Sequence, residues 1–253
     1  MRALLRKSSV QKTLAVLIAL LVWQIGAMIL NEELILPTPV RVLVRLFTVW
    51  QLEGVFAAIW YSLLRIALGF FLALLLGTVL AVIAGRFPFV ETLLFPYMAV
   101  VKAVPVVSFI VLAYVWMSSR TIAVFISFLI VLPTVYTGLL SGIKARDAKL
   151  EEMADVFGVS AKDRFLYLRL PNLAPYITSA VSLGAGLAWK SGVAAEIIAV
   201  TSKSIGGMLY SASLEMRNVD LFAMTALLVL LSILFEKLLV LLLKLVFRRL
   251  WHK

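Results

Sequence analysis

Several charged residues of this sequence lie within or directly beside long apolar stretches, among them Arg65, Lys102, Lys190 and Glu196. A charge in apolar surroundings is costly, so it is usually retained where it pairs with an opposite charge or meets a charged ligand. A lysine or arginine in such a place offers positive potential to an anion. The alternative is internal pairing, in which each lysine contacts a carboxylate, and Glu196 is the obvious partner.

Other reactive groups are scarce. The sequence contains no Cys, one His near its end (His252) and no G-x-x-x-x-G-K-[S/T] phosphate-binding loop. Thiol chemistry is therefore excluded, and a metal site or histidine-based catalysis has no support. We expect a protein that is not an enzyme, holds no cofactor of its own and does not bind a nucleotide triphosphate in a P-loop.

The composition places these charges in a membrane. The chain is 63% hydrophobic and 15% charged, with a mean hydropathy of +1.07, which is far outside the range of soluble domains. Runs of roughly 18 or more apolar residues can each cross a hydrocarbon core about 30 Å thick as a helix. We place such runs at residues 14–30, 66–85, 93–117, 121–140, 173–200 and 221–243. The predicted fold is an all-α membrane protein with about six transmembrane helices.

The distribution of Lys and Arg outside these runs predicts the orientation. With the N-terminus inside, fourteen basic residues face the cytoplasm and five face the opposite side. This bias favours both termini in the cytoplasm and contact of the basic residues with anionic lipid. No recognisable nucleic-acid-binding module accompanies the net charge of +11. We expect a multi-pass protein and no nucleic-acid partner.

The predicted spans assign each of the charged residues in the apolar stretches a position in the membrane. Lys102 lies near mid-membrane, just before Pro105, which breaks the helix. Lys190 and Glu196 lie in the outer half of the fifth run and point about 120° apart on a straight helix, so we do not expect them to pair within it. Arg65 begins the second run, where it either contacts a gate or extends to the membrane interface.

A charged segment at residues 144–171 cannot lie in a bilayer, because it holds six Lys/Arg and five Asp/Glu. Asp147 can cap a short helix, Gly158 can end it, and Ser160 with Asp163 resembles a capping box that opens a second helix. Pro171 is expected to limit that second helix. An apolar stripe of the first helix comprises Leu150, Met153, Ala154 and Phe157. This stripe either docks a partner or folds back onto the chain's own helices.

The spacing in this segment resembles a known loop. Within residues 152–171 the sequence has E-M-A, then G six residues after the E, then L-x-L-P after a gap of nine residues. This is similar to the EAA loop of permease subunits of binding-protein-dependent ABC importers. Met153 replaces the middle Ala and Leu168 replaces Ile, and both substitutions keep an apolar residue.

The resemblance covers roughly residues 36–240. The stretches L-P-T-P at 36–39, S-L-L-R-I-A-L-G-F at 62–70, K-A-V-P at 102–105 and V-A-A-E at 193–196 resemble the branch that imports sulfonates, taurine and nitrate. Permeases of thiamine-precursor pyrimidines and of riboflavin are also similar, so the substrate stays open between a small anionic solute and such a nutrient.

The resemblance implies a type I ABC importer permease fold in which the cytoplasmic loop supplies a coupling helix. It also implies a single domain over residues 1–253, with an extra helix within 1–35, a core at 60–245 and the coupling loop at 144–171. The ATPase-coupling residues would be Glu151, Glu152, Met153, Ala154, Phe157 and Gly158. In this scheme Glu152 makes a charged contact, Ala154 permits close helix approach and Gly158 permits the backbone angle of the turn.

The same resemblance implies the partners. Two copies of an ATPase subunit would hold ATP and Mg, a second permease copy would complete the pathway as a homodimer or a related heterodimer, and a periplasmic or lipid-anchored solute-binding protein would deliver the substrate. The location would be a bacterial cytoplasmic (inner) membrane. The substrate path is expected to include Arg65, Lys102, Pro105, Lys190 and Glu196. An alternative from another class is a carrier or channel that works without ATP.

Overall fold

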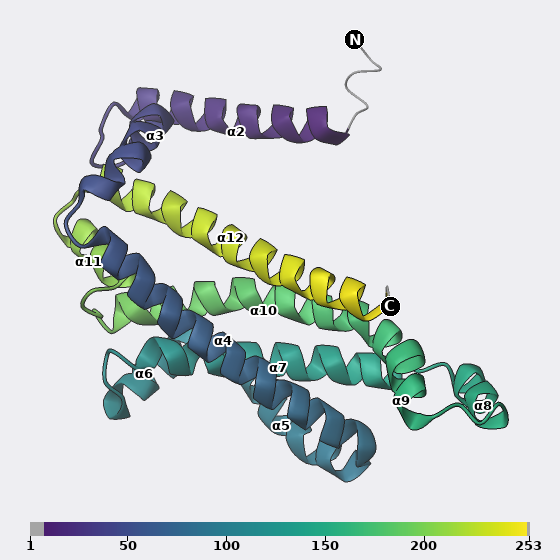
Figure 1. Cartoon of the computed structure of the whole chain (residues 1–253). Helices are drawn as coiled ribbons and strands as arrows, with labels where there is room; N and C mark the ends of the chain where they lie inside the picture. Colours follow the sequence, from purple (N-terminus) through teal and green to yellow (C-terminus); the bar gives the residue numbers. More distant parts are fainter. Residues whose placement is uncertain (1–7, 252–253) are drawn as a thin grey trace.

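The computed structural model describes residues 8–251, and every regular element in that range is helical. Figure 1 shows the helices running mainly lengthwise between the two ends of the molecule. The elements are α2 (Ser8–Leu30), α3 (Pro39–Thr48), η1 (Val49–Gln51), α4 (Val55–Arg86), α5 (Pro88–Ala103), α6 (Val106–Trp116), α7 (Ile122–Lys144), α8 (Ala148–Val156), α9 (Ala161–Asp163), η2 (Arg164–Arg169), α10 (Leu170–Ile198), α11 (Ile205–Leu214) and α12 (Asn218–Trp251). His252 lies outside the described residues.

Long apolar helices confirm the membrane class of the fold. Four helices in the described range are long and apolar enough to span a bilayer, within α2, α4, α7 and α12. The predicted run at 93–117 is divided into α5 and α6, which bend by 101° at the break before Pro105. The bent pair is either one broken span or a re-entrant loop, so the apolar spans number four or five in this part of the chain.

The fifth predicted run became α10, which has 29 residues but is not among the four helices that are long and apolar enough to span a bilayer. Its position explains its composition. α10 packs against α7, α4 and α12, so much of its surface meets other helices instead of lipid. Small and polar residues are favoured in such a place because they allow close approach and hydrogen bonding between helices.

Small residues set the contact at the centre of the fold, where α4, α7 and α10 meet. A Cβ on Gly69 of α4 would lie 2.4 Å from the carbonyl oxygen of Val124 in α7, and one on Gly192 of α10 would lie 2.7 Å from Ile66. The large side chains around this contact are fully buried, with Trp189 and Phe70 both packed edge-on against Phe235 of α12. The core therefore depends on backbones that approach closely.

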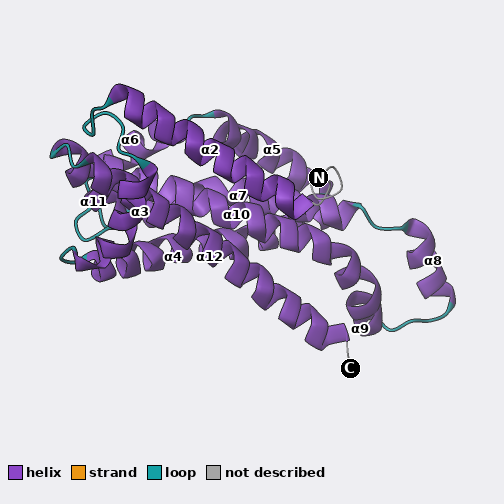
Figure 2. Cartoon of the chain, turned by 90° about the horizontal axis from the view of Figure 1, so that it is seen from above, coloured by secondary structure: helices purple, strands orange, loops and turns teal. Residues whose placement is uncertain are grey.

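The two ends of the molecule carry different elements. Figure 1 shows the start of α2, the end of α12 and the α8–α9 segment at one end, with α3, α6 and α11 at the other. Figure 2, turned by 90°, shows α8 extending beyond the helical body. The start of α2, the end of α12 and the charged segment therefore lie at the same end of the molecule.

Gly69→Ala should destabilise the fold by about 1–3 kcal/mol, because the added methyl meets a backbone oxygen that cannot move aside. Gly186→Ala in α10 is the matched control, since nothing lies within 4 Å of its Cβ position. Thermal unfolding of the purified variants in detergent measures the difference. Equal stability of the two variants would refute the close α4–α7 contact.

Candidate functional site

The α8–α9 segment forms the hairpin that its capping signals predict. The Asp147 side chain accepts a hydrogen bond from the Lys149 amide at 2.9 Å, and α8 begins at the next residue after Asp147. Gly158 has a φ of +63°, which lies in the left-handed region that favours glycine. Ser160 accepts from the Asp163 amide at 3.1 Å and donates to the Asp163 carboxylate at 2.7 Å. These three local predictions are confirmed.

Ion pairs close the hairpin. Arg169 donates from two nitrogens to the two carboxylate oxygens of Glu151, at 2.8 and 2.9 Å. Arg164 donates to Asp155 at 2.5 Å and also lies 3.7 Å from Glu151. A bidentate pair of this kind fixes direction as well as distance, because both groups are planar. The two arms of the hairpin are thus held at a defined spacing.

The prediction that Pro171 limits the second helix is wrong. The chain stays helical from Ala161 through the wide π-turn segment η2 into α10, and Pro171 lies in the first turn of α10. Proline lacks an amide hydrogen, and the first turn of a helix is where that loss is tolerated. The amide just before it, of Leu170, bonds to the Phe165 carbonyl five residues back. The hairpin is therefore continuous with the central helix of the fold.

The apolar residues of α8 remain largely uncovered. Ala154 is 3% exposed, whereas Val156 is 84% and Phe157 is 77% exposed. Leu150 and Met153 are also exposed. The alternative in which the stripe folds back on the chain's own helices is wrong for every member except Ala154. The exposed residues of this segment form a surface that we name the α8 tip. It comprises the apolar residues 150, 153, 156 and 157 together with Glu152 and Gly158.

A second cluster lies at the opposite end of α10, around the fully buried carboxylate of Glu196. One carboxylate oxygen accepts hydrogen bonds from the hydroxyl of Ser62 in α4 at 2.7 Å and from the amide of Gly206 in α11 at 3.2 Å. The same hydroxyl accepts from the Ile205 amide at 3.0 Å. The other carboxylate oxygen of Glu196 lies 3.6 Å from a guanidinium nitrogen of Arg65. One carboxylate therefore joins three helices.

Arg65 is the second charged residue of this cluster. Its side chain is mostly buried in α4, 5.7 Å from the ring of Tyr61, and its nearest carboxylate is Glu196. The structure thus brings together two of the predicted path residues. It also contradicts the pairing of Glu196 with a lysine. The sequence analysis missed Ser62 and Gly206, although a serine three residues before Arg65 was a usable signal.

The remaining path candidates lie apart from this cluster. Lys102 is exposed at the end of α5 and donates to the hydroxyl of Thr137 in α7 at 3.1 Å. Pro105 is exposed at the α5–α6 bend. Lys190 is exposed on α10 and has no ion pair with any residue in the range 8–251. These three residues therefore do not form one site with Arg65 and Glu196.

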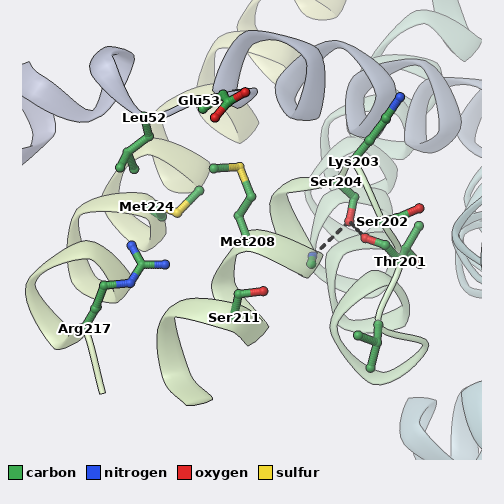
Figure 3. Close-up of a pocket in the computed structure, with 12 residues that line it drawn as sticks. Leu52, Glu53, Thr201, Ser202, Lys203, Ser204, Met208, Ser211, Arg217 and Met224 are labelled. Atoms are coloured by element: carbon green, nitrogen blue, oxygen red, sulfur yellow. Dashed lines mark hydrogen bonds between the residues drawn. The ribbon is translucent and has the colours of Figure 1, made fainter. Parts of the chain in front are cut away.

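A cavity of about 450 Å³ adjoins the Glu196 cluster at the end of the molecule that carries α11. Figure 3 shows Met208, Met224 and Arg217 around it, with Ser204 on the far wall and the Lys203 amine directed away. The Ser204 hydroxyl donates to the Thr201 carbonyl and accepts from the Gly207 amide, at 2.7 and 2.9 Å. This cap fixes the start of α11 beside the cavity.

The hairpin, α7 and α10 lie within one family signature. Residues 73–252 match the model of the family described as "Binding-protein-dependent transport system inner membrane component". The chain belongs to this family. It is 31% identical over 206 residues to the taurine transport system permease protein TauC of Escherichia coli, covering 79% of this chain and 74% of that protein.

Other members of this permease family show the same extent of similarity. The nitrate import permease protein NrtB of Synechococcus elongatus is 28% identical, covering 76% of this chain and 71% of its own length. The putative aliphatic sulfonates transport permease protein SsuC of Bacillus subtilis is 30% identical, covering 78% and 71%. The resemblance found in the sequence motifs is confirmed, and the protein is a multi-pass membrane permease component.

The Glu151–Arg169 pair makes the stability of this permease depend on pH. Hydrogen bonding to Arg169 holds the pKa of the Glu151 carboxyl below its ordinary range. The carboxylate therefore stabilises the hairpin fully above the unfolded-state pKa of about 4.3, and this contribution is lost as pH falls through the lower folded-state value. Glu151→Gln should melt at a lower temperature than the wild type near pH 7, and the gap should narrow progressively as the pH falls below about 4. The exposed Glu152→Gln is the control, and a gap that persists in acid would contradict the assignment.

Glu196→Ala should cost about 3–5 kcal/mol, because it leaves Arg65 buried without its carboxylate and the hydroxyl hydrogen of Ser62 without an acceptor. Glu196→Gln should cost less, since it keeps an acceptor for Ser62 and Gly206. The exposed Glu215→Gln, on the same side of the molecule, should change stability by less than about 0.5 kcal/mol. Chemical or thermal unfolding in detergent tests this order, and a harmless Glu196→Ala would show that the cluster holds nothing together.

Proposed function

We propose that this permease is the subunit of an ATP-driven importer through which a small anionic solute crosses the membrane, with its α8 tip docked on a separate ATPase. The observation that carries the proposal is the α8 tip itself. It combines uncovered apolar side chains with a backbone braced by charged pairs. A rigid apolar projection outside the bilayer is an unfavourable surface unless a protein partner covers it.

The hairpin geometry supports the transmission of movement. A displacement of α8 acts through Glu151 on Arg169, which is the last residue of η2. η2 continues directly into α10, and α10 reaches Glu196 near its far end. Because α10 has 29 residues at a rise of about 1.5 Å each, it spans roughly 43 Å. On this proposal a push at the hairpin alters the contact of α10 with α4 and α11.

The relatives support the choice of solute. Their printed names concern taurine, nitrate and aliphatic sulfonates, and a nitrate ion or a sulfonate group is an oxyanion. We extend this chemistry to the present chain as a proposal. A thiamine-precursor pyrimidine or a riboflavin-like nutrient is the alternative cargo, and transport with the cognate solute-binding protein decides between them.

The proposed assembly places two copies of this chain around a two-fold axis, two ATPase subunits with ATP and Mg under the α8 tips, and one solute-binding protein at the end that carries α11. Both termini and the hairpin then face the cytoplasm of a bacterial cell. The position of the start of α2, the end of α12 and the hairpin at one end of the molecule supports this orientation (Figure 1).

Val156→Asp should abolish recovery of the ATPase with the permease, because a charge would enter an apolar contact. Val156 is largely exposed, so the permease itself should fold normally. Co-purification from the native operon, followed by solute-stimulated ATP hydrolysis, measures the effect. Met216→Asp is the matched control, since Met216 is also an exposed apolar residue but lies at the opposite end of the molecule, after α11.

Unchanged ATPase recovery with Val156→Asp would remove the docking role of the α8 tip. Uptake that continues in proteoliposomes without ATP would favour the carrier or channel alternative. Loss of ATPase recovery with Met216→Asp as well would indicate a general folding defect, and the thermal stability of each variant separates that outcome from a specific one.

A further inference from the structure

A groove of about 340 Å³ lies between α5 and α7, separate from the Glu196 cluster and from the α8 tip. Glu91 and Lys144 line one end of it, and Lys102 and Thr137 also line it. Apolar side chains, among them Phe95, form the remaining wall. The groove therefore has a polar lining within an apolar surface, as small-molecule sites commonly do.

The two lysines of the groove differ in their partners. Lys144 donates to both carboxylate oxygens of Glu91, at 2.5 and 2.6 Å, so this pair is neutral overall. Lys102 has no carboxylate within ion-pair distance in the described part of the chain. Its only hydrogen bond there is to Thr137. The groove thus carries one positive charge that the protein does not balance.

The hydrogen-bonding groups of the groove are also incompletely used. An ammonium group has three donors, and Lys102 uses one of them on the Thr137 hydroxyl. Thr137 gives its own hydrogen to the Pro133 carbonyl at 2.7 Å. Tyr136, which is 3% exposed and lines the groove, has a buried hydroxyl without a partner. The unused groups are therefore donors, and they require an acceptor.

We propose that this groove is a binding subsite for one small monovalent oxyanion, a sulfonate or nitrate, held by Lys102 and Tyr136 with Thr137 fixing the lysine. The inference deepens the proposed function, because it places the anionic solute at a defined point of the chain. The unbalanced charge selects an anion, the free donors select an oxygen acceptor, and the apolar wall accommodates a short alkyl group. Lys102 lies in the last turn of α5, immediately before the bend at Pro105, so occupancy would be sensed where the helix changes direction.

The test measures acetylation of Lys102 by an amine-reactive ester in the full chain, purified with its partner subunits in phosphatidylcholine nanodiscs. Methanesulfonate should slow acetylation of Lys102 in a saturable manner, because a bound anion covers the amine. Dimethyl sulfone, a neutral molecule of similar shape, should not. Lys190, also exposed, serves as the internal control in the same mass spectrum.

Tyr136→Phe should raise the methanesulfonate concentration that halves the Lys102 rate by about tenfold, since one hydrogen bond to a charged ligand is lost. Tyr97→Phe is the matched control, because Tyr97 is exposed on α5 and does not line the groove. No slowing by methanesulfonate, equal slowing by dimethyl sulfone, or equal slowing at Lys190 would each overturn the subsite. So would protection that requires phosphatidylglycerol in the nanodisc, because the anion would then be a lipid headgroup.

This outcome is separable from that of the docking experiment. If the ATPase binds the α8 tip but Lys102 is never protected, the subsite is refuted and the coupling role stands. If Lys102 is protected but Val156→Asp leaves ATPase recovery unchanged, the coupling role is refuted and the subsite stands.

Discussion

The rest of this structure depends on one fully buried carboxylate. The Glu196 carboxylate accepts hydrogen bonds from the hydroxyl of Ser62 in α4 and the amide of Gly206 in α11, and it lies beside the guanidinium of Arg65. A charge in such a place is costly alone, and it is tolerated because donors surround it. The start of the short helix α11 is held beside the 450 Å³ cavity by its Gly206 amide on Glu196, its Ile205 amide on Ser62 and the Ser204 cap. The close approach of α4, α7 and α10 through glycines then determines where that carboxylate lies.

Much of the fold was accessible from local sequence signals. The caps at Asp147, Gly158 and Ser160 act within a few residues, and each was predicted correctly because its physics is local. The break before Pro105 was predictable for the same reason. Apolar length alone marked α10 as a span, although its small and polar residues reflect burial among other helices. The angle of the bend between α5 and α6 could not be predicted from the sequence, because tertiary packing sets it.

The contacts that form the sites were harder to predict from the sequence than the helices. The Glu196–Ser62 contact joins residues 134 apart in the chain, and no periodicity links them. The pairing of Lys144 with Glu91 and the unpartnered hydroxyl of Tyr136 likewise depend on how α5 lies against α7. A sequence shows that a charge lies in an apolar run. Which of several candidates becomes its partner is decided by tertiary packing, and for Glu196 that partner was an arginine instead of a lysine.

The wide η2 turn also allows the direction of the α8 hairpin and the packing of the membrane core to change independently during evolution. A π turn accommodates one more residue than an α-helical turn, so it rotates the helix before it relative to the helix after it. The direction in which the α8 hairpin projects is therefore set by six residues at 164–169, while α10 keeps its own register against α4 and α7. Substitutions in this short segment could re-aim the hairpin toward a differently shaped partner without repacking the membrane core.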